Sequence, residues 1–263
     1  GLLNTGWGDH GHYQPLGQSW YGYVYGAAQA WSGGATADED FDSVFGRLWF
    51  GSDGPAIVSA MRELGRLNTL PGMPRPNQSN SITMLLEDPL ASQLASTVPP
   101  ETLDTILRVT AQAEEVFRAA WRTSCDPSTL EEMIHSARWM AYAARKLQVS
   151  QSIGADLAES EPAPARAARS RDALRALELE LVPLQAEFVR LWRLRARDSE
   201  IGQHLGALSS LRERLRLAQG YLDEIANGER DRFDLQAYLA ETPPYEILGE
   251  HFWRLMRQVN ASL

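Results

Sequence analysis

The feature that most constrains this chain is its helix-forming composition from residue 99 onward. Ala, Leu, Arg and Glu dominate this part of the sequence, and these residues are well suited to helices. Leucines recur there at a roughly three-and-four spacing, which places them on one face of a helix. The pattern predicts long amphipathic helices that pack against one another, and therefore a mainly α fold containing a multi-helix bundle. The leucines are Leu174, Leu177, Leu181, Leu184, Leu191 and Leu194.

Start and stop residues divide the chain into predicted elements. Pro is favoured in the first turn of a helix, and Asn-Gly is typical of a helix end. A short strand is expected at residues 2–5, and Pro183 is expected to bend the helix that contains it. The predicted helices cover residues 19–31, 38–50, 53–68, 99–124, 126–159, 164–197, 200–226 and 247–259, with a short element at 82–86.

The composition also changes along the chain. Residues 1–54 hold 12 of the 20 glycines, 4 of the 8 tryptophans and 4 of the 8 tyrosines. Glycine with aromatic residues is typical of a ligand-facing loop, where the backbone approaches closely and flat rings stack. We therefore divide the chain into an N-terminal segment at 1–54, a connecting helix and linker at 55–98, and an α-helical domain at 99–263.

Charge and cysteine content exclude several classes of protein. The formal net charge of −9 argues against a nucleic-acid-binding protein, which needs excess Lys and Arg to displace counterions. The sequence contains no run of about 18 apolar residues, so it predicts no membrane span. The single cysteine, Cys125, excludes an internal disulfide and favours a cytoplasmic location. Localisation stays open, because a signal peptide would lie before Gly1, the first residue of this sequence.

One loop carries side chains suited to sugar binding. Between Asn4 and His12 the glycine-spaced sequence presents Trp7 and Asp9. An indole ring offers a flat wall for the apolar face of a sugar. A carboxylate two residues later can accept hydrogen bonds from a pair of hydroxyls. Loops of this kind follow the strands of a β/α barrel at the face where sites are built.

The residues Asn-Thr-Gly-Trp-Gly-Asp-His-Gly-His, followed by Tyr-Gly-Tyr-Val-Tyr-Gly-Ala-Ala-Gln-Ala-Trp, resemble the barrel end of family 20 glycoside hydrolases, the β-N-acetylhexosaminidases. The likeness is to the bacterial branch with a helical C-terminal extension. A weaker likeness lies in residues 191–197. The resemblance implies that the chain contains the last strand and helix of a (β/α)8 barrel, followed by the helical domain. It also implies that Trp7 lines the sugar subsite and Asp9 binds sugar hydroxyls. Gly6 stands where the bacterial motif has Asp, and Asp9 replaces the Glu of the wider family.

The same resemblance implies a substrate-assisted, retaining hydrolysis of terminal N-acetylhexosamine, in which the sugar's own acetamido oxygen attacks the anomeric carbon. In the family an adjacent Asp-Glu pair on the fourth strand orients that group and protonates the leaving oxygen. That pair is expected upstream of Gly1, so we assign no catalytic residue, metal or cofactor to this chain. We expect an active glycosidase as the parent protein and an inactive isolated chain. The expected partner is a carbohydrate, bound together with the rest of the barrel.

Other interpretations are open. The chain could be a non-enzymatic α-helical interaction module, and its helices could form a homodimer. Asp9, His10 and His12 could bind a metal ion, although structural roles are favoured. Glu132 and His135 have a Glu-x-x-His spacing found in di-iron bundles, but no second copy exists, and an ordinary solvated helix face is expected. Cys125 is expected to be half-buried. Core positions are expected for four tryptophans, Trp121, Trp139, Trp192 and Trp253.

Overall fold

The computed structural model describes residues 3–6, 13–33, 40–73, 79–158, 164–199 and 201–242. Helices cover 79% of these residues, and no strand occurs among them. The prediction of a mainly α chain with a multi-helix bundle is therefore confirmed. Within the strand predicted at 2–5, the described residues 3–5 are not in a strand, because an extended segment is stabilised by pairing with a neighbouring strand. The barrel-end assignment stays a prediction.

Short elements make up the N-terminal part of the fold. Most of them begin near a proline or a small polar residue, as the sequence predicted. They are η1 (Leu16–Ser19), α1 (Trp20–Ser32), α2 (Phe41–Phe50), α3 (Gly54–Arg66), η2 (Leu67–Thr69), α4 (Asn80–Leu86) and η3 (Leu94–Ser96).

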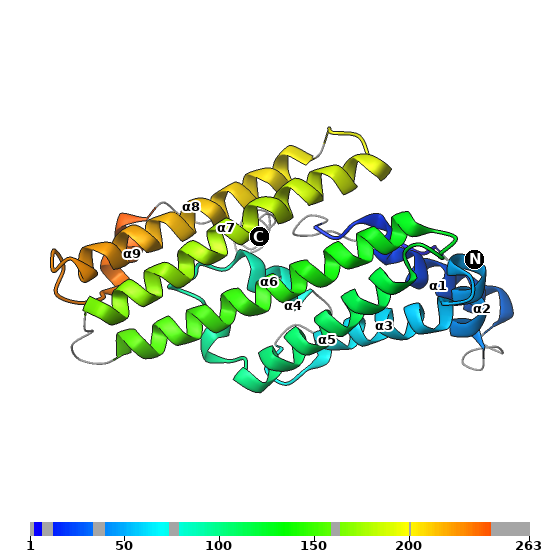
Figure 1. Cartoon of the computed structure of the whole chain (residues 1–263), viewed down its shortest axis with the longest axis horizontal. Coiled ribbons are helices and arrows are strands. Elements are labelled where there is room, and N and C mark those ends of the chain that lie inside the picture. Colours follow the sequence, from blue (N-terminus) through cyan, green and yellow to red (C-terminus); the bar gives the residue numbers. More distant parts are fainter. Residues whose placement is uncertain are drawn as a thin grey trace, which may run out of the picture.

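Long helices form the rest of the described chain, and they run along the long axis of the molecule (Figure 1). Proline occupies the first residue of α5, α6 and α7, where its missing N–H costs nothing. α7 continues through Pro183 to its end at Arg195. The helix predicted at 247–259 lies outside the described residues. The long elements, together with the short α9, are α5 (Pro100–Ala120), α6 (Pro127–Ala158), α7 (Pro164–Arg195), α8 (Ile201–Ala226) and α9 (Leu235–Glu241).

α6 is the central helix of the bundle. It packs against α5 on one side and α7 on the other, and it also contacts α4, η1 and η3. α8 packs along α7, while α1 and α2 lie at one end of the molecule and α9 at the other (Figure 1). A helix surrounded in this way is buried on most of its circumference, so polar residues on it must find partners inside the protein.

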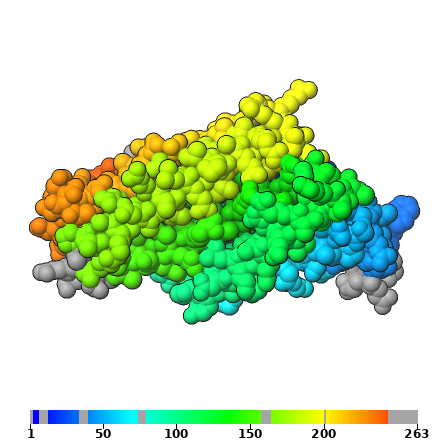
Figure 2. Space-filling model, viewed as in Figure 1, coloured from blue at the N-terminus to red at the C-terminus, as the bar shows by residue number. Residues whose placement is uncertain are grey.

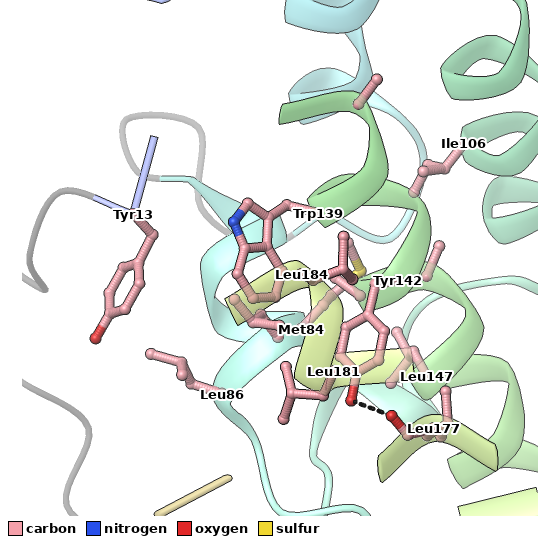
Figure 3. Close-up of a cluster of buried hydrophobic side chains, with 14 of the residues drawn as sticks. Tyr13, Met84, Leu86, Ile106, Trp139, Tyr142, Leu147, Leu177, Leu181 and Leu184 are labelled. Atoms are coloured by element: carbon pink, nitrogen blue, oxygen red, sulfur yellow. Dashed lines mark hydrogen bonds between the residues drawn. The ribbon is translucent and has the colours of Figure 1, made fainter. Parts of the chain in front are cut away.

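The core is apolar and continuous from Tyr13 to Tyr238. Figure 3 shows a part of it in which Met84 of α4 lies beside Trp139 and Tyr142 of α6 and the leucines of α7. The Tyr142 hydroxyl donates to the Leu177 carbonyl at 3.2 Å. This core includes residues from all three predicted segments, and the division at residues 54 and 98 stays a prediction.

The predicted leucine stripe of α7 is buried except at its end, where Leu194 is 50% exposed. The last turn of α7 contacts α6 and α8 through Arg195 and Trp192, and Leu194 does not share that side. The tryptophans also divide: Trp139 is buried, Trp192 packs partly against the core, and Trp121 is 40% exposed. The prediction of a core position is wrong for Trp121, because α5 ends at the buried Ala120 and Trp121 begins the exposed turn that follows. Trp253 lies outside the described residues.

Cys125 is exposed, so the expectation of a half-buried thiol is wrong. The residue belongs to the turn between α5 and α6, and its amide donates to the Phe50 carbonyl at 3.2 Å. The backbone hydrogen bond holds the turn against α2 and leaves the side chain outside.

Lys146 is the only lysine in the chain, beside 24 arginines, and it is completely buried on α6. Its Nζ donates to the Met84 carbonyl at 3.0 Å. That carbonyl belongs to the last turn of α4, where helix carbonyls lack intrahelical partners. Burial lowers the pKa of Lys146 to about 8, against the opposing effect of Glu87 and Asp88. The lysine therefore satisfies a carbonyl in the last turn of α4, at the cost of desolvating an ammonium group.

This cost predicts how stability depends on pH. The pKa of an unfolded lysine is about 10.4, so the unfolded chain binds more protons than the folded one between pH 8 and that value. Stability contributed by Lys146 is therefore lowest below pH 8 and rises with pH. Lys146→Met removes this dependence. Between about pH 7.5 and about pH 10, we expect the wild type to gain about 2 kcal/mol in unfolding free energy relative to Lys146→Met. Urea unfolding of both proteins at the two pH values measures it, and a constant difference would contradict it.

Candidate functional site

Trp7 and Asp9, the predicted sugar-binding residues, lie outside the described residues, as do His10 and His12. The segments on either side of them are described. These segments show what holds the two ends of the 7–12 stretch, and they define the candidate site in this chain.

The segment before the stretch lies against α1. The side-chain amide of Asn4 donates to the Tyr23 carbonyl at 3.0 Å. A Cβ added to Gly26 would come within 2.8 Å of the Asn4 side chain, and one added to Gly6 would overlap the Tyr23 hydroxyl. Two glycines therefore allow residues 4–6 to approach the helix closely.

The segment after the stretch is held by the bundle. Tyr13 is buried, and its ring lies edge-on to His204 of α8 at a centroid distance of 5.1 Å. The same ring stacks near Phe188 of α7 at 6.5 Å. Burial raises the pKa of Tyr13 well above its usual range, so its hydroxyl stays protonated. Tyr13 directly follows the predicted loop, and these contacts hold the chain at that point against α7 and α8.

A second anchor lies four residues later, in η1. The amide of Gly17 donates to Glu132 Oε2 at 2.6 Å, and both residues are buried. A Cβ on Gly17 would overlap the Glu132 carboxylate, so only glycine lets the backbone reach it. The other oxygen, Oε1, accepts from Arg195 Nε at 2.7 Å. Arg195 also donates to Thr129 Oγ1 at 3.1 Å. We call Gly17, Glu132 and Arg195 the Glu132 clamp.

The clamp corrects the expectation of a solvated face at Glu132 and His135, because both side chains are completely buried. A sequence signal for this burial exists. Glu132, His135, Trp139, Tyr142 and Lys146 follow one another at intervals of three and four residues, which is one face of α6. The charged residues of this stripe led to the expectation of a solvated face, although the stripe also contains apolar and aromatic residues. Arg195, Tyr13 and Gly17 carried no such signal, since their roles depend on contacts between distant elements.

His135 belongs to a hydrogen-bonded group of ionisable side chains that includes Glu187 and Arg138. Its Nδ1 lies 3.4 Å from Glu187 Oε2, and Arg138 donates to the same oxygen at 3.0 Å. Burial lowers the pKa of His135, which favours the neutral ring donating through Nδ1. The hydrogen bond from His135, with the charge of Arg138, lowers the pKa of Glu187 to about 2. The His135 Nε2 atom has no hydrogen-bond partner among the described residues.

A groove of about 500 Å³ runs above α6 between α5 and α7, where the surface is hollowed in Figure 2. Its floor includes Ala137 and Ala141. The charged groups on its walls are already matched. Arg138 pairs with Glu114 and Glu187, and Arg145 pairs with Glu180. Groups neutralised in this way leave little charge for a polar substrate, so we assign the groove no chemistry.

The open side of α1 is the last feature of this region. α1 contains no charged residue, yet none of its residues is buried. Trp31 is 95% exposed, and Leu48 of the neighbouring α2 is 80% exposed. A helix that is apolar around its circumference is normally covered, and exposed apolar patches mark interaction sites.

Neither metal sites nor membrane spans were found in the described part of the chain. No three His, Cys, Asp or Glu side chains gather there in a way that could hold a metal ion. None of the helices described is both long and apolar enough to cross a bilayer. A scan of protein-family models and a search of curated proteins each found no match to this chain.

The clamp predicts an effect of Gly17→Ala. The new methyl group would overlap the Glu132 carboxylate, so either η1 moves away or the carboxylate leaves Arg195. We expect a loss of about 1–3 kcal/mol in unfolding free energy, the usual cost of overpacking a buried position. The control is Gly206→Ala in α8, where a Cβ meets nothing within 4 Å and helix propensity predicts a small gain. Equal effects of the two substitutions in urea unfolding would contradict the prediction.

Proposed function

We propose that this chain is the C-terminal region of a β-N-acetylhexosaminidase-like glycoside hydrolase, in which Trp7 and Asp9 line the sugar subsite. The observation that carries the proposal is the sequence motif from Asn4 to His12, followed by the aromatic, glycine-containing helix that begins at Trp20. Trp7 supplies a wall against the apolar face of the sugar. The Asp9 carboxylate accepts hydrogen bonds from the sugar hydroxyls.

In this proposal the reaction is substrate-assisted and the acid groups come from elsewhere in the intact protein. The acetamido oxygen of the N-acetylhexosamine attacks the anomeric carbon, and an Asp-Glu pair preceding Trp7 orients it and protonates the leaving oxygen. The role of this chain is to bind and orient the sugar. Binding groups of this kind contribute by holding the reacting atoms in an attack geometry.

The open surface of α1 supports the proposal. A helix that closes a barrel packs one face on the strands and another on neighbouring helices. In the described chain, α1 contacts η1, α2, Arg62 of α3 and residues 4–6, and none of its residues is buried. Tyr21 packs edge-on against Phe41 at 5.5 Å and Phe45 at 5.4 Å. The exposed Trp31 is then available to contact the rest of a barrel.

A second candidate is an α-helical interaction module, through which the chain would bind another protein or a second copy of itself. The same exposed side chains of α1 and α2 favour it, because exposed apolar side chains can contact any protein partner. The coding sequence that precedes Gly1 separates the candidates. Seven further strands and an Asp-Glu pair in the same reading frame support the hydrolase, and an initiating Met directly before Gly1 supports the module.

The activity test uses the longer protein encoded with that preceding sequence. Release of 4-nitrophenol from 4-nitrophenyl N-acetyl-β-glucosaminide measures turnover. We expect Trp7→Ala and Asp9→Asn to lower kcat/KM by about 10- to 100-fold, the effect of losing contacts of roughly 1.5–3 kcal/mol. The controls are Trp121→Ala, an exposed ring at the end of α5, and Asp231→Asn, an exposed carboxylate after α8. Wild-type levels in the Trp7 and Asp9 variants would overturn the proposed roles, as would turnover by the isolated 263-residue chain.

A further inference from the structure

We propose that Glu132 is a positioning residue, which holds the segment following the predicted sugar loop in a fixed place on the helical bundle. The segment consists of residues 13–19, and Glu132 lies more than 100 residues further along the chain, on the buried face of α6. The step from this segment to sugar binding rests on the proposed function. The contact between Glu132 and the segment is independent of it.

The geometry of the carboxylate carries the inference. Its two oxygens have different tasks: Oε2 accepts from the Gly17 amide at 2.6 Å, and Oε1 accepts from Arg195 Nε at 2.7 Å. Arg195 belongs to the last turn of α7, and its hydrogen bond directs the carboxylate. A charge-assisted hydrogen bond to a backbone amide is directional. The carboxylate therefore fixes one point of the backbone and does more than fill space.

Neighbouring contacts hold the same segment at other points. Tyr13 is buried beside Phe188 and His204, and the Ser136 hydroxyl donates to the Gln18 side chain at 3.3 Å. Ser136 lies one helical turn beyond Glu132. The segment is therefore attached to α6, α7 and α8 together, and α6 provides two of the contacts.

A carboxylate is an expensive choice for this buried position. An apolar side chain of similar size would avoid the desolvation of a charge, but it would offer no acceptor to the Gly17 amide. Positional control of η1 is a benefit that only an acceptor provides. Under the proposed function, displacement of the segment would shift the loop that carries Trp7 and Asp9, and shifts of about 1 Å can cost an enzyme about 10²-fold.

The first experiment measures the contact itself by hydrogen exchange and mass spectrometry on the 263-residue chain. In Glu132→Ala, we expect the peptide covering residues 13–19 to exchange about tenfold faster, with the peptides of α8 unchanged. Glu131→Ala is the matched control, since Glu131 is the neighbouring glutamate of α6 and its carboxylate pairs with Arg190 of α7 at 2.8 Å. Glu132→Gln keeps an acceptor of the same length and should retain most of the protection.

A substitution at Gly17, the other partner in the contact, distinguishes the loss of this contact from general unfolding. Gly17→Ala and Glu132→Ala break the same interaction, so the double variant should exchange no faster than Glu132→Ala alone. Equal exchange of residues 13–19 in Glu132→Ala and Glu131→Ala would overturn the inference, as would additive effects in the double variant.

The second experiment uses the longer protein and the same 4-nitrophenyl substrate. We expect Glu132→Ala to raise KM about tenfold with kcat changed less, as for lost uniform binding, and Glu132→Gln to restore KM. Faster exchange with an unchanged KM would overturn the positioning role. Absence of turnover by the wild-type longer protein would instead refute the proposed function, and hydrogen exchange would still decide whether Glu132 holds the segment.

Discussion

The described structure depends on the partners that Glu132, Tyr142 and Lys146, polar residues on the buried face of α6, find in other elements. A central helix has neighbours on most sides, and a polar side chain on it has no access to water. Glu132 is paired with Gly17 and Arg195, and Tyr142 with the Leu177 carbonyl. Lys146 is paired with the Met84 carbonyl. These contacts reach three other elements, so α6 connects η1, α7 and α4 through directional bonds as well as through apolar packing.

This arrangement explains how residues 13–19 are held against the bundle. Apolar burial alone would tolerate several positions of η1, because hydrophobic contacts are weakly directional. The Glu132 carboxylate and the buried Tyr13 ring specify one position. By contrast, the outer side of α1 has no such constraint in the described chain, and it presents Trp31 to the surroundings. The region thus has a fixed side, facing the bundle, and an open side.

The exposed apolar surface of α1 and α2 and the paired charges of the groove above α6 have different implications for function. The groups that line the groove above α6 form pairs with one another, such as Arg145 with Glu180, and this accounts for their presence without a ligand. The apolar surface of α1 and α2 has no such internal explanation. A larger body packed on that surface is what the proposed hydrolase requires. An interaction module would use the same side chains.

The sequence by itself determined the helices. Their apolar periodicity and their prolines are local signals, so α5 to α8 begin within a few residues of the predicted positions, and the predicted leucine stripe of α7 faces the core up to Leu191. It also predicts Trp7 and Asp9 as residues for a sugar, and both lie outside the described residues. Only the tertiary structure decided that Glu132 and His135 are buried, that Trp121 and Cys125 are exposed, and that Gly17 meets Glu132. The physical reason is that periodicity identifies which residues share a helix face, whereas burial depends on what the fold places against that face. For α6 the neighbours on several sides come from segments up to about 115 residues away.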